Sequence, residues 1–220
     1  ATHPLIARQL GREVTALVQT ASGWLAQGEG WQVEAERAVV CCSYQARRLA
    51  QFAAFPLQPV RGQISVLSAT QASSQLRAVL CADGYCTPAL QGRHVAGATT
   101  VFDDDATDLR VAEHAENLAK LAEHMPALAQ ALGSVDTAGL QGRAGVRCSV
   151  PGATPLAGEV LPGLYCSLAH GTRGLLTSGM AGEAVAAAMC GQFAPLPQSI
   201  LDTLAPGRRL ARGAGNTTAL

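Results

Sequence analysis

Short apolar runs separated by glycine and polar turns dominate the pattern of this chain. The runs at 37–42 and 164–168 do not alternate with polar residues, so they predict strands buried on both faces, as in a parallel sheet. Ser43 follows the first run and is a suitable N-cap for a helix through about Phe52. A β-hairpin or meander is predicted near the N-terminal end, where strand-like segments flank several glycines. These are segments 14–18 and 31–33 and the glycines Gly23, Gly28 and Gly30.

The middle of the chain predicts a block of antiparallel strands. Pro56 and Pro59 indicate an extended linker, because proline disfavours continued helix. The strands expected after it are separated by polar or glycine turns. They are segments 60–67, 76–82, 85–87, 95–101 and 139–149.

Two long helices are predicted. The first is capped by Thr107 and ends before Pro126, and a short continuation at 127–132 stops at Gly133. Its expected core face repeats at steps of three and four residues. That face consists of Leu109, Ala112, Ala115, Leu118, Ala122 and Met125. The second helix covers 175–189.

Buried apolar strands near both ends and an antiparallel block with a helix between them predict an α+β fold, in which one sheet domain is interrupted by an inserted one. We expect four parts. They are a first part of the outer domain with a β-meander at 1–58, an inserted domain at 59–140, a second part of the outer domain at 141–204, and a flexible tail at 205–220.

Composition excludes several classes of protein. The chain has 220 residues, 48% of them hydrophobic, with 16 basic and 16 acidic side chains, so no global basic field indicates nucleic acid or a membrane surface. No apolar run reaches the roughly 20 residues that span a bilayer. The seven cysteines are scattered and predict small core residues in a reducing compartment, without a zinc site. The acidic turn at 103–105 predicts a solvated loop, with calcium as the lesser alternative.

The segment 169–176 (AHGTRGLL) carries the strongest candidate chemistry. A buried strand, a glycine-rich turn and a helix start follow one another here, and this layout directs unpaired backbone N–H groups and the positive end of the helix dipole to one place. Such a place can hold a phosphate, a carboxylate or the electron-rich edge of a reduced flavin. The spacing alone also fits a tight strand-to-helix turn without a ligand.

Several segments resemble amine and amino-acid oxidases with the D-amino-acid-oxidase fold. The matching segments, in the order of that family, are 58–65 (QPVRGQIS), 84–88 (GYCTP), 95–99 (VAGAT), 145–148 (GVRC), 155–158 (PLAG) and 170–174 (HGTRG). Within the superfamily, segments 84–90, 103–105, 116–118 (ENL), 143–148 (RAGVRC) and 170–174 are similar to the C-terminal oxidoreductase domain of bifunctional tRNA 5-methylaminomethyl-2-thiouridine biosynthesis proteins. The similarity covers about 35–188.

The chain departs from this family in three ways. The Gly-x-Gly-x-x-Gly motif of the dinucleotide-binding βαβ unit is missing, as is the methyltransferase domain, so we expect a piece of such an enzyme. Gly152 occupies a position where the family has an acidic residue, and Ala169 one where relatives usually have glycine.

The resemblance implies an FAD-dependent oxidation of a secondary amine. A hydride passes from the carbon beside the nitrogen to the flavin, the imine hydrolyses, and oxygen reoxidises the flavin. In the tRNA enzymes the substrate is the carboxymethylaminomethyl group of the wobble uridine; glyoxylate leaves and an aminomethyl group remains for methylation. The implied partners are tRNA and a methyltransferase domain of the same parent polypeptide, with no membrane, and the implied location is the cytoplasm.

The same resemblance suggests which residues bind the substrate. Arg147 is the expected clamp for its carboxylate, because a planar guanidinium binds a carboxylate through two hydrogen bonds. A structural ion pair is the alternative role. Arg143, four residues earlier on the same strand, is the alternate clamp. Tyr85 is expected to donate its hydroxyl to the same carboxylate, or else to be an ordinary half-buried tyrosine. Arg61 is expected to hold a turn between domains through backbone carbonyls.

The flavin is expected to contact the turn at 170–175 and the end of the first buried strand. The residues are His170, Gly171, Thr172, Arg173, Gly174 and Leu175, and Cys42 and Ser43. The backbone N–H groups of 172–175 would stabilise the charge of the reduced ring. A structural hydrogen-bonding role is the alternative for His170. Two basic clusters, Arg47 with Arg48 and Arg208 with Arg209 and Arg212, are expected to be solvated rather than to bind RNA.

Two other functions remain open from the sequence. One is an oxidase of the same fold that acts on glycine, sarcosine or a D-amino acid. The other is a non-catalytic module, because the dinucleotide-binding half is missing.

Overall fold

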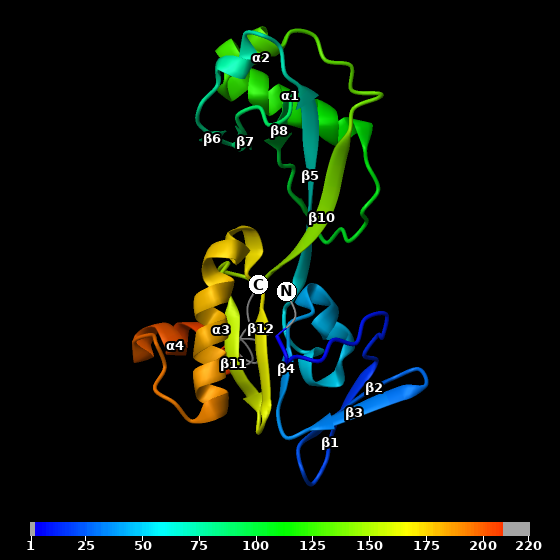
Figure 1. Cartoon of the computed structure of the whole chain (residues 1–220), viewed down its shortest axis with the longest axis vertical. Helices are drawn as coiled ribbons and strands as arrows, with labels where there is room; N and C mark the ends of the chain where they lie inside the picture. Colours follow the sequence, from blue (N-terminus) through cyan, green and yellow to red (C-terminus); the bar gives the residue numbers. More distant parts are fainter. Residues whose placement is uncertain (1–2, 209–220) are drawn as a thin grey trace, which may run out of the picture. The chain divides into compact units, whose positions relative to one another are not determined.

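The computed structural model describes residues 3–208, which divide into two units (Figure 1). Unit 1 contains the chain up to Leu57 and from Cys148 onward, and unit 2 is Gln58–Arg147. The first boundary lies one residue from the expected position. The second was placed too early, because residues 141–147 belong to a strand that pairs within unit 2.

The N-terminal part of unit 1 is an antiparallel meander. It consists of β1 (Ala16–Gln19), β2 (Trp24–Gly28) and β3 (Trp31–Ala35), so the predicted meander is confirmed. Gly23 has φ +148°, and a Cβ there would lie 2.3 Å from the Ala35 carbonyl oxygen, so only glycine fits the turn. The Trp24 indole is buried and donates a hydrogen bond to the Pro162 carbonyl at 3.0 Å, which fixes the meander to the rest of unit 1.

A second sheet of unit 1 has the order β11–β12–β4. Its strands are β4 (Ala38–Val40), β11 (Leu156–Leu161) and β12 (Leu164–Leu168). β12 pairs with β4 in parallel, as the apolar runs predicted, and antiparallel with β11, a strand that the pattern did not reveal. The prediction that 37–42 is buried on both faces is wrong. β4 is an edge strand, and its Val39 is 39% exposed and lines an open cavity beside Val14 and Arg48.

Two helices pack against this sheet. α3 (Gly174–Cys190) contacts β11 and β12, while α4 (Gln198–Leu204), which was not predicted, contacts β11. The expected helix at 43–52 is instead two short 3₁₀ helices, η1 (Ser43–Arg48) and η2 (Ala50–Phe52). Ser43 does not cap them, because its own backbone has φ +60° and it lies inside the first turn.

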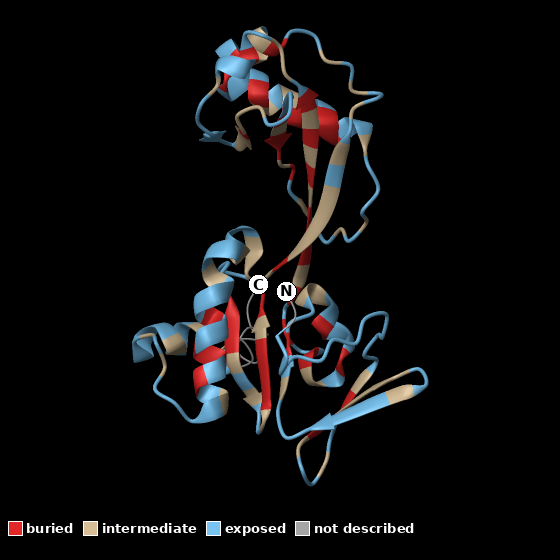
Figure 2. Ribbon diagram, in the orientation of Figure 1, coloured by how far each residue is buried: buried red, intermediate tan, exposed pale blue. Residues whose placement is uncertain are grey.

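The buried residues of unit 1, red in Figure 2, include a large apolar cluster. The core combines the meander, the 3₁₀ segment and the β11–β12–β4 sheet, and a smaller cluster lies under α3. Its largest buried members include Trp24, Phe52, Phe55, Leu156, Leu164 and Leu168. The predicted flexible tail begins too early. Pro206 is buried, and Arg208 donates hydrogen bonds to the carbonyls of Thr154 and Pro155; residues 209–220 lie outside the described part.

Unit 2 is a six-stranded sheet covered by two helices. The sheet order is β10–β5–β8–β7–β6, and β9 also pairs with β5. The strands are β5 (Gln58–Ser68), β6 (Leu80–Ala82), β7 (Gly84–Cys86), β8 (Arg93–Gly97), β9 (Val101–Phe102) and β10 (Gly142–Ser149). The strand expected at 76–82 is shorter, because β6 begins only at Leu80, and the short helix η3 (Ser73–Gln75) precedes it.

The helices of unit 2 are α1 (Val111–His124) and α2 (Pro126–Leu132). α1 begins four residues after Thr107, so that residue is not its cap. The predicted core face is wrong for most of its length. Leu109 and Val111 are exposed, whereas Glu113, His114, Asn117 and Leu121 are buried. The helix is rotated toward its polar side because the strand beneath it is polar there, as described below. The α+β class of the chain is confirmed.

Candidate functional site

Unit 2 has a polar interior between β5 and α1. Arg61, Gln63 and Ser65 are all 0% exposed and occur at every second position of β5, so they share one face of the strand. Leu67 continues the same face and belongs to the apolar cluster with Leu121. The interface therefore changes from charged to apolar along the strand, and α1 matches it with Glu113 at one end and Leu121 at the other.

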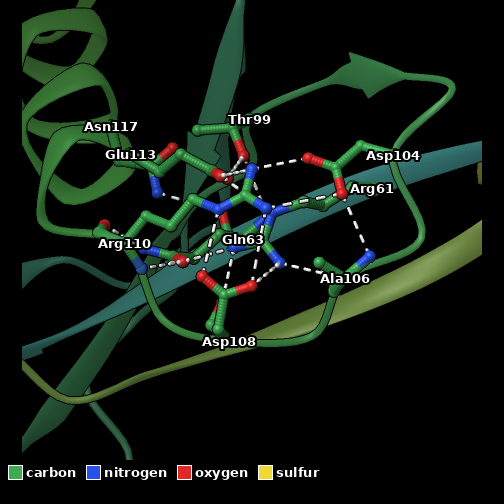
Figure 3. A network of polar contacts seen from close by, with 9 residues as sticks. All are labelled: Arg61, Gln63, Thr99, Asp104, Ala106, Asp108, Arg110, Glu113 and Asn117. Carbon is green, nitrogen blue, oxygen red and sulfur yellow. Dashed lines mark hydrogen bonds and ion pairs between the residues drawn. The ribbon is translucent and has the colours of Figure 1, made fainter.

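Arg61 is the most heavily bonded side chain of this interface (Figure 3). Its guanidinium donates to Glu113 Oε1 at 2.8 Å, to the carbonyls of Ala106 and Asp108 at 2.6 Å each, and to Gln63 Oε1 at 2.9 Å. A fully buried charge is tolerated only when it is paired and hydrogen-bonded, which is the case here. The expectation that Arg61 binds backbone carbonyls is confirmed, although both carbonyls lie inside unit 2.

Thr99 joins the other side of this network. Its hydroxyl accepts a hydrogen bond from the Gln63 backbone N–H at 2.9 Å and donates to Glu113 Oε2. Glu113 thus receives Arg61 on one oxygen and Thr99 on the other. Gln63 also binds both backbone groups of Arg110, at 2.8 and 2.9 Å. The network fixes the loop before α1, β5 and the Thr99 segment to one another.

Ser65 and His114 form a buried pair beside the network. Asn117 Nδ2 donates to Ser65 Oγ at 3.1 Å, and the same hydroxyl is hydrogen-bonded to His114 Nδ1 at 2.7 Å. Burial lowers the pKa of His114. The imidazole is therefore neutral at pH 7, and the pair acts as a structural contact of α1.

The acidic turn is part of the outer edge of this network. Asp104 and Asp108 pair with Arg110, and hydrogen bonds from Arg110 lower the pKa of both carboxyl groups. Asp103 accepts a hydrogen bond from Gln58. These carboxylates are already engaged by side chains, and no group of three metal-binding side chains occurs among residues 3–208.

Arg147 lies at the end of β10 in unit 2 and is half-buried. Its Nη2 donates to Thr100 Oγ1 at 3.0 Å, and its Nη1 would lie 3.0 Å from a Cβ added at Gly62. Desolvation lowers its pKa, opposed by an electrostatic interaction with Tyr85. No carboxylate of the described residues forms an ion pair with it, so its alternative role as one half of a structural ion pair is wrong. A desolvated guanidinium without an acidic partner is suited to an external carboxylate.

Tyr85 and Arg143 differ in their relation to Arg147. Tyr85 is half-buried on β7, opposite Gly97 of β8, and is close enough to Arg147 to affect its pKa. Arg143 lies four residues before Arg147 on β10 and is exposed. The structure therefore associates Tyr85 with Arg147 electrostatically and leaves Arg143 in solvent.

The glycine-rich turn in unit 1 is the 3₁₀ helix η4 (Gly171–Arg173), which leads directly into α3. His170 is bonded on both ring nitrogens: Nε2 to Ser167 Oγ at 3.0 Å and Nδ1 to Thr177 Oγ1 at 2.9 Å. Thr177 donates its own proton to the Arg173 carbonyl. Its hydroxyl therefore accepts from His170, whose proton is on Nδ1, and burial lowers the pKa of the ring. The His170 side chain thus connects β12 to the first turn of α3.

The N-terminus of α3 has no side-chain cap and is open to solvent. Its first turn contains no acidic residue. The first N–H groups of a helix lack partners within the helix, and the helix dipole is positive there. Thr172, Arg173 and Leu175 are exposed, and a Cβ at Gly171 would meet nothing within 4 Å. The turn is therefore open to a planar, electron-rich group.

Cys42 and Ser43 follow β4 and are exposed or half-exposed. The prediction that the cysteines are core residues is wrong for four of the seven. Cys41, Cys42, Cys81 and Cys190 are exposed because they lie at strand edges or at the end of α3, whereas Cys86, Cys148 and Cys166 are buried.

The basic clusters are partly engaged within the chain. Arg47 lies over the Tyr44 ring, with its guanidinium carbon 5.6 Å from the ring centroid, and Arg48 pairs with Glu13 at 3.5 Å. The expectation that Arg208 is solvated is wrong, because two backbone carbonyls bind it. Arg209 and Arg212 lie outside the described residues.

Sequence reasoning missed the contacts that surround Arg147. Thr100 binds its guanidinium and Gly62 leaves room for it, but neither residue was singled out. It also missed Glu113 as the partner of Arg61. The alternation of Arg61, Gln63 and Ser65 on an otherwise apolar strand was the available indication that a polar helix face would cover them.

Comparison with known proteins now defines the class. Residues 7–188 match the family described as FAD dependent oxidoreductase, and the chain belongs to this family. It is 49% identical over 209 residues to the tRNA 5-methylaminomethyl-2-thiouridine biosynthesis bifunctional protein of Nitrosospira multiformis, which covers 90% of this chain and 34% of that protein. It is 36% identical over 244 residues to the protein of the same name from Chromobacterium violaceum, covering 96% and 37%. The chain thus spans about a third of the length of these relatives.

Solved structures show the same fold. Glycine oxidase from Geobacillus kaustophilus has a TM-score of 0.74 and 22% identity over 88% of this chain and 51% of its own. Iminodiacetate oxidase from Chelativorans sp. BNC1 has a TM-score of 0.69 and 22% identity, with coverages of 89% and 52%. The expected D-amino-acid-oxidase-like fold is confirmed. Among the helices of residues 3–208, none has the length and apolar character needed to cross a membrane.

Proposed function

We propose that this chain is the substrate-binding and flavin-edge part of an FAD-dependent oxidoreductase that modifies tRNA. The reaction removes the carboxymethyl group from carboxymethylaminomethyl-(2-thio)uridine at the wobble position. The observation that carries the proposal is the 49% identity with a relative named for this pathway of tRNA modification. Because the chain covers 34% of that relative, the activity belongs to the whole protein.

Arg147 and Tyr85 are the proposed substrate-binding residues. A desolvated guanidinium that no described carboxylate neutralises attracts the carboxylate of the leaving group, and Arg remains charged at pH 7. Tyr85 would donate its hydroxyl to the same carboxylate. Arg143 is exposed, so we assign it an auxiliary role in attracting the anionic substrate.

The flavin-binding residues proposed in this chain are the turn from His170 to Leu175 and, with less contact, Cys42 and Ser43. FAD, when bound, supplies an acceptor for the hydride of the carbon beside the amine. The backbone N–H groups of Thr172, Arg173, Gly174 and Leu175 would stabilise negative charge at the edge of the ring. His170 would keep this turn in place. The pyrophosphate must be held elsewhere, because the chain has no Gly-x-Gly-x-x-Gly motif.

The proposed partners follow from the same relatives. The substrate is tRNA, and a methyltransferase domain of the same parent polypeptide would receive the aminomethyl product. We propose a cytoplasmic location, in keeping with a tRNA substrate. The chain has no net charge, so affinity for tRNA would come from a local basic patch or from other domains.

The test uses the purified chain with added FAD, alone and within its longer parent protein. Three substrates are compared: tRNA that carries carboxymethylaminomethyluridine, free glycine and free sarcosine. Flavin absorbance and glyoxylate release with the tRNA support the proposal. Peroxide release with glycine or sarcosine only would replace it with a small-amine oxidase. Absence of flavin binding and turnover in both forms would leave a non-catalytic module.

Arg147→Ala tests the carboxylate clamp in the active form. Hydrogen bonds to a charged group contribute about 1.5–3 kcal/mol, so KM should rise roughly 10- to 100-fold. Arg147→Lys should recover only part of this, because an ammonium lacks the planar fork. Unchanged KM in Arg147→Ala would remove this residue from the site.

A further inference from the structure

Arg147 is held from two sides by residues of unit 2. Thr100 Oγ1 accepts from Nη2 at 3.0 Å. On the other side Nη1 lies over Gly62, where a Cβ would stand 3.0 Å from it. A glycine at this position lets the guanidinium lie directly against the β5 backbone.

Both supports are sequence neighbours of residues in the buried network. Gly62 lies between Arg61 and Gln63, whose side chains point to α1, so it faces the opposite side of β5. Thr100 follows Thr99, which is 0% exposed and bonded to the Gln63 backbone and to Glu113. The segment at Gly62 and the segment at Thr100 are thus both held in place by the Glu113 carboxylate.

The connection is direct on each side. Glu113 Oε1 accepts from Arg61 at 2.8 Å, and Glu113 Oε2 accepts from Thr99. A shift of either segment would move Gly62 relative to Thr100, and the guanidinium between them would lose its fixed orientation. The buried network therefore stabilises the packing of α1 on one face of the sheet and the orientation of Arg147 on the other face.

We propose that Thr99 and Glu113 are positioning residues for Arg147: through Gly62 and Thr100 they hold its guanidinium in the orientation that accepts the substrate carboxylate. This proposal rests on the proposed function for the identity of the ligand. It goes beyond that function by assigning a role to two buried residues that touch neither substrate nor flavin.

The experiment compares variants of Thr99 in the full chain. Thr99→Val removes the hydroxyl at nearly constant volume, and Thr99→Ser keeps it. Thr70→Val is the matched control. Thr70 Oγ1 also makes two hydrogen bonds, accepting from Ser73 N and donating to the Ala131 carbonyl, and it lies in the same unit. Glu113→Gln is the second test, because its amide retains an acceptor for Arg61 and loses the one for Thr99.

Two readouts separate positioning from ligand binding. The first is the NMR order parameter of the Arg147 Nε–H bond, assigned with Arg147→Lys. The second is the dissociation constant for iminodiacetate, a small amine dicarboxylate, followed by the same resonance. We expect Thr99→Val and Glu113→Gln to lower the order parameter and to weaken iminodiacetate on the order of tenfold or more, since small misplacements of a binding group are costly. Thr99→Ser and Thr70→Val should behave as wild type.

An unchanged Arg147 order parameter in folded Thr99→Val or Glu113→Gln overturns the proposal. Thr99→Ser is expected to fold in any case, and loss of order in Thr99→Ser would also overturn it, because the hydroxyl would then not be the cause. If iminodiacetate does not bind wild type while Thr99→Val still loses order, positioning is supported and the carboxylate assignment of the proposed function fails.

Discussion

The two long helices of this chain differ in which of their faces is buried. α1 buries Glu113, His114 and Asn117 and exposes apolar side chains at its start, such as Val111. α3 is apolar on nearly all sides, buries small residues such as Ala181 and Val185, and exposes Leu175 and Leu176. For α1, the amphipathic pattern predicted a different buried face.

The difference shows that the partner surface decides which helix face is buried. β5 presents charged and polar side chains, so the matching face of α1 is polar and binds them through Glu113 and Asn117. β11 and β12 present apolar side chains to one face of α3. No described element covers its other face, where Leu175 is fully exposed. A helix that is apolar on all sides normally has partners on more than one side.

The largest effect is expected at the buried ion pair of unit 2. Arg61→Met removes the fully buried cation 2.8 Å from Glu113 and leaves Arg110, 3.5 Å away, as its remaining cation; breaking such a buried pair typically costs about 3–5 kcal/mol of unfolding free energy. Urea denaturation measures it. The double variant Arg61→Met/Glu113→Leu should recover part of the loss, because no isolated charge remains. If both variants unfold at the wild-type urea concentration, the polar interface does not contribute to stability.

Replacing one leucine on each helix compares the buried face of α1 with the exposed face of α3. Leu121→Ala on α1 removes a side chain that is 4% exposed and should cost about 2–5 kcal/mol. Leu176→Ala on α3 removes one that is 76% exposed and should change the unfolding free energy of the chain by less than about 0.5 kcal/mol. Thermal and urea unfolding provide the values. A large loss in Leu176→Ala would show that this face of α3 is already covered.

The buried histidine of α1 predicts how stability depends on pH. Burial lowers the pKa of His114 below its usual 6.5 in the folded chain, and nearby Glu113 and the Leu140 backbone oppose this. As pH falls below about 6.5, the unfolded chain takes up this proton first, so the unfolding free energy should fall. The ion pairs of Asp104 and Asp108 stop contributing to the unfolding free energy only at lower pH, as pH falls below about 3.8.

Urea midpoints between about pH 7.5 and about pH 5 test this dependence. His170 also has a lowered pKa, so each histidine is replaced separately by asparagine. Each single variant should reduce the fall of the urea midpoint between about pH 7.5 and about pH 5. Equal pH slopes in wild type and His114→Asn would show that His114 is protonated equally in the folded and unfolded chain.

A small effect is also expected on the exposed side of α1. Glu116 pairs with Lys120 one turn later at 2.9 Å, and Glu116→Gln should cost less than about 1 kcal/mol, because exposed ion pairs contribute little. The loss should disappear at high salt. A cost comparable with that of Arg61→Met would mean that burial does not distinguish the two faces of α1.

The sequence by itself determined the α+β class, the two-part division of the chain, and the existence of most strands and both long helices. Apolar runs and turn residues are local features, and they predict well where helices and strands occur. The resemblance also identified Arg147, Tyr85 and the turn at 170–174 as the residues to consider.

Only the tertiary structure decided which face of each element is buried and what surrounds Arg147. Leu109 and Ala112 looked like core positions, but α1 instead turns Glu113 toward Arg61 because an unpaired buried charge costs more free energy than an exposed leucine. In the same way, Gly62, Thr99 and Thr100 acquire their relation to Arg147 only when β5, β10 and the segment after β8 meet. Contacts between residues distant in sequence leave no local pattern, so the chain had to fold before they could be recognised.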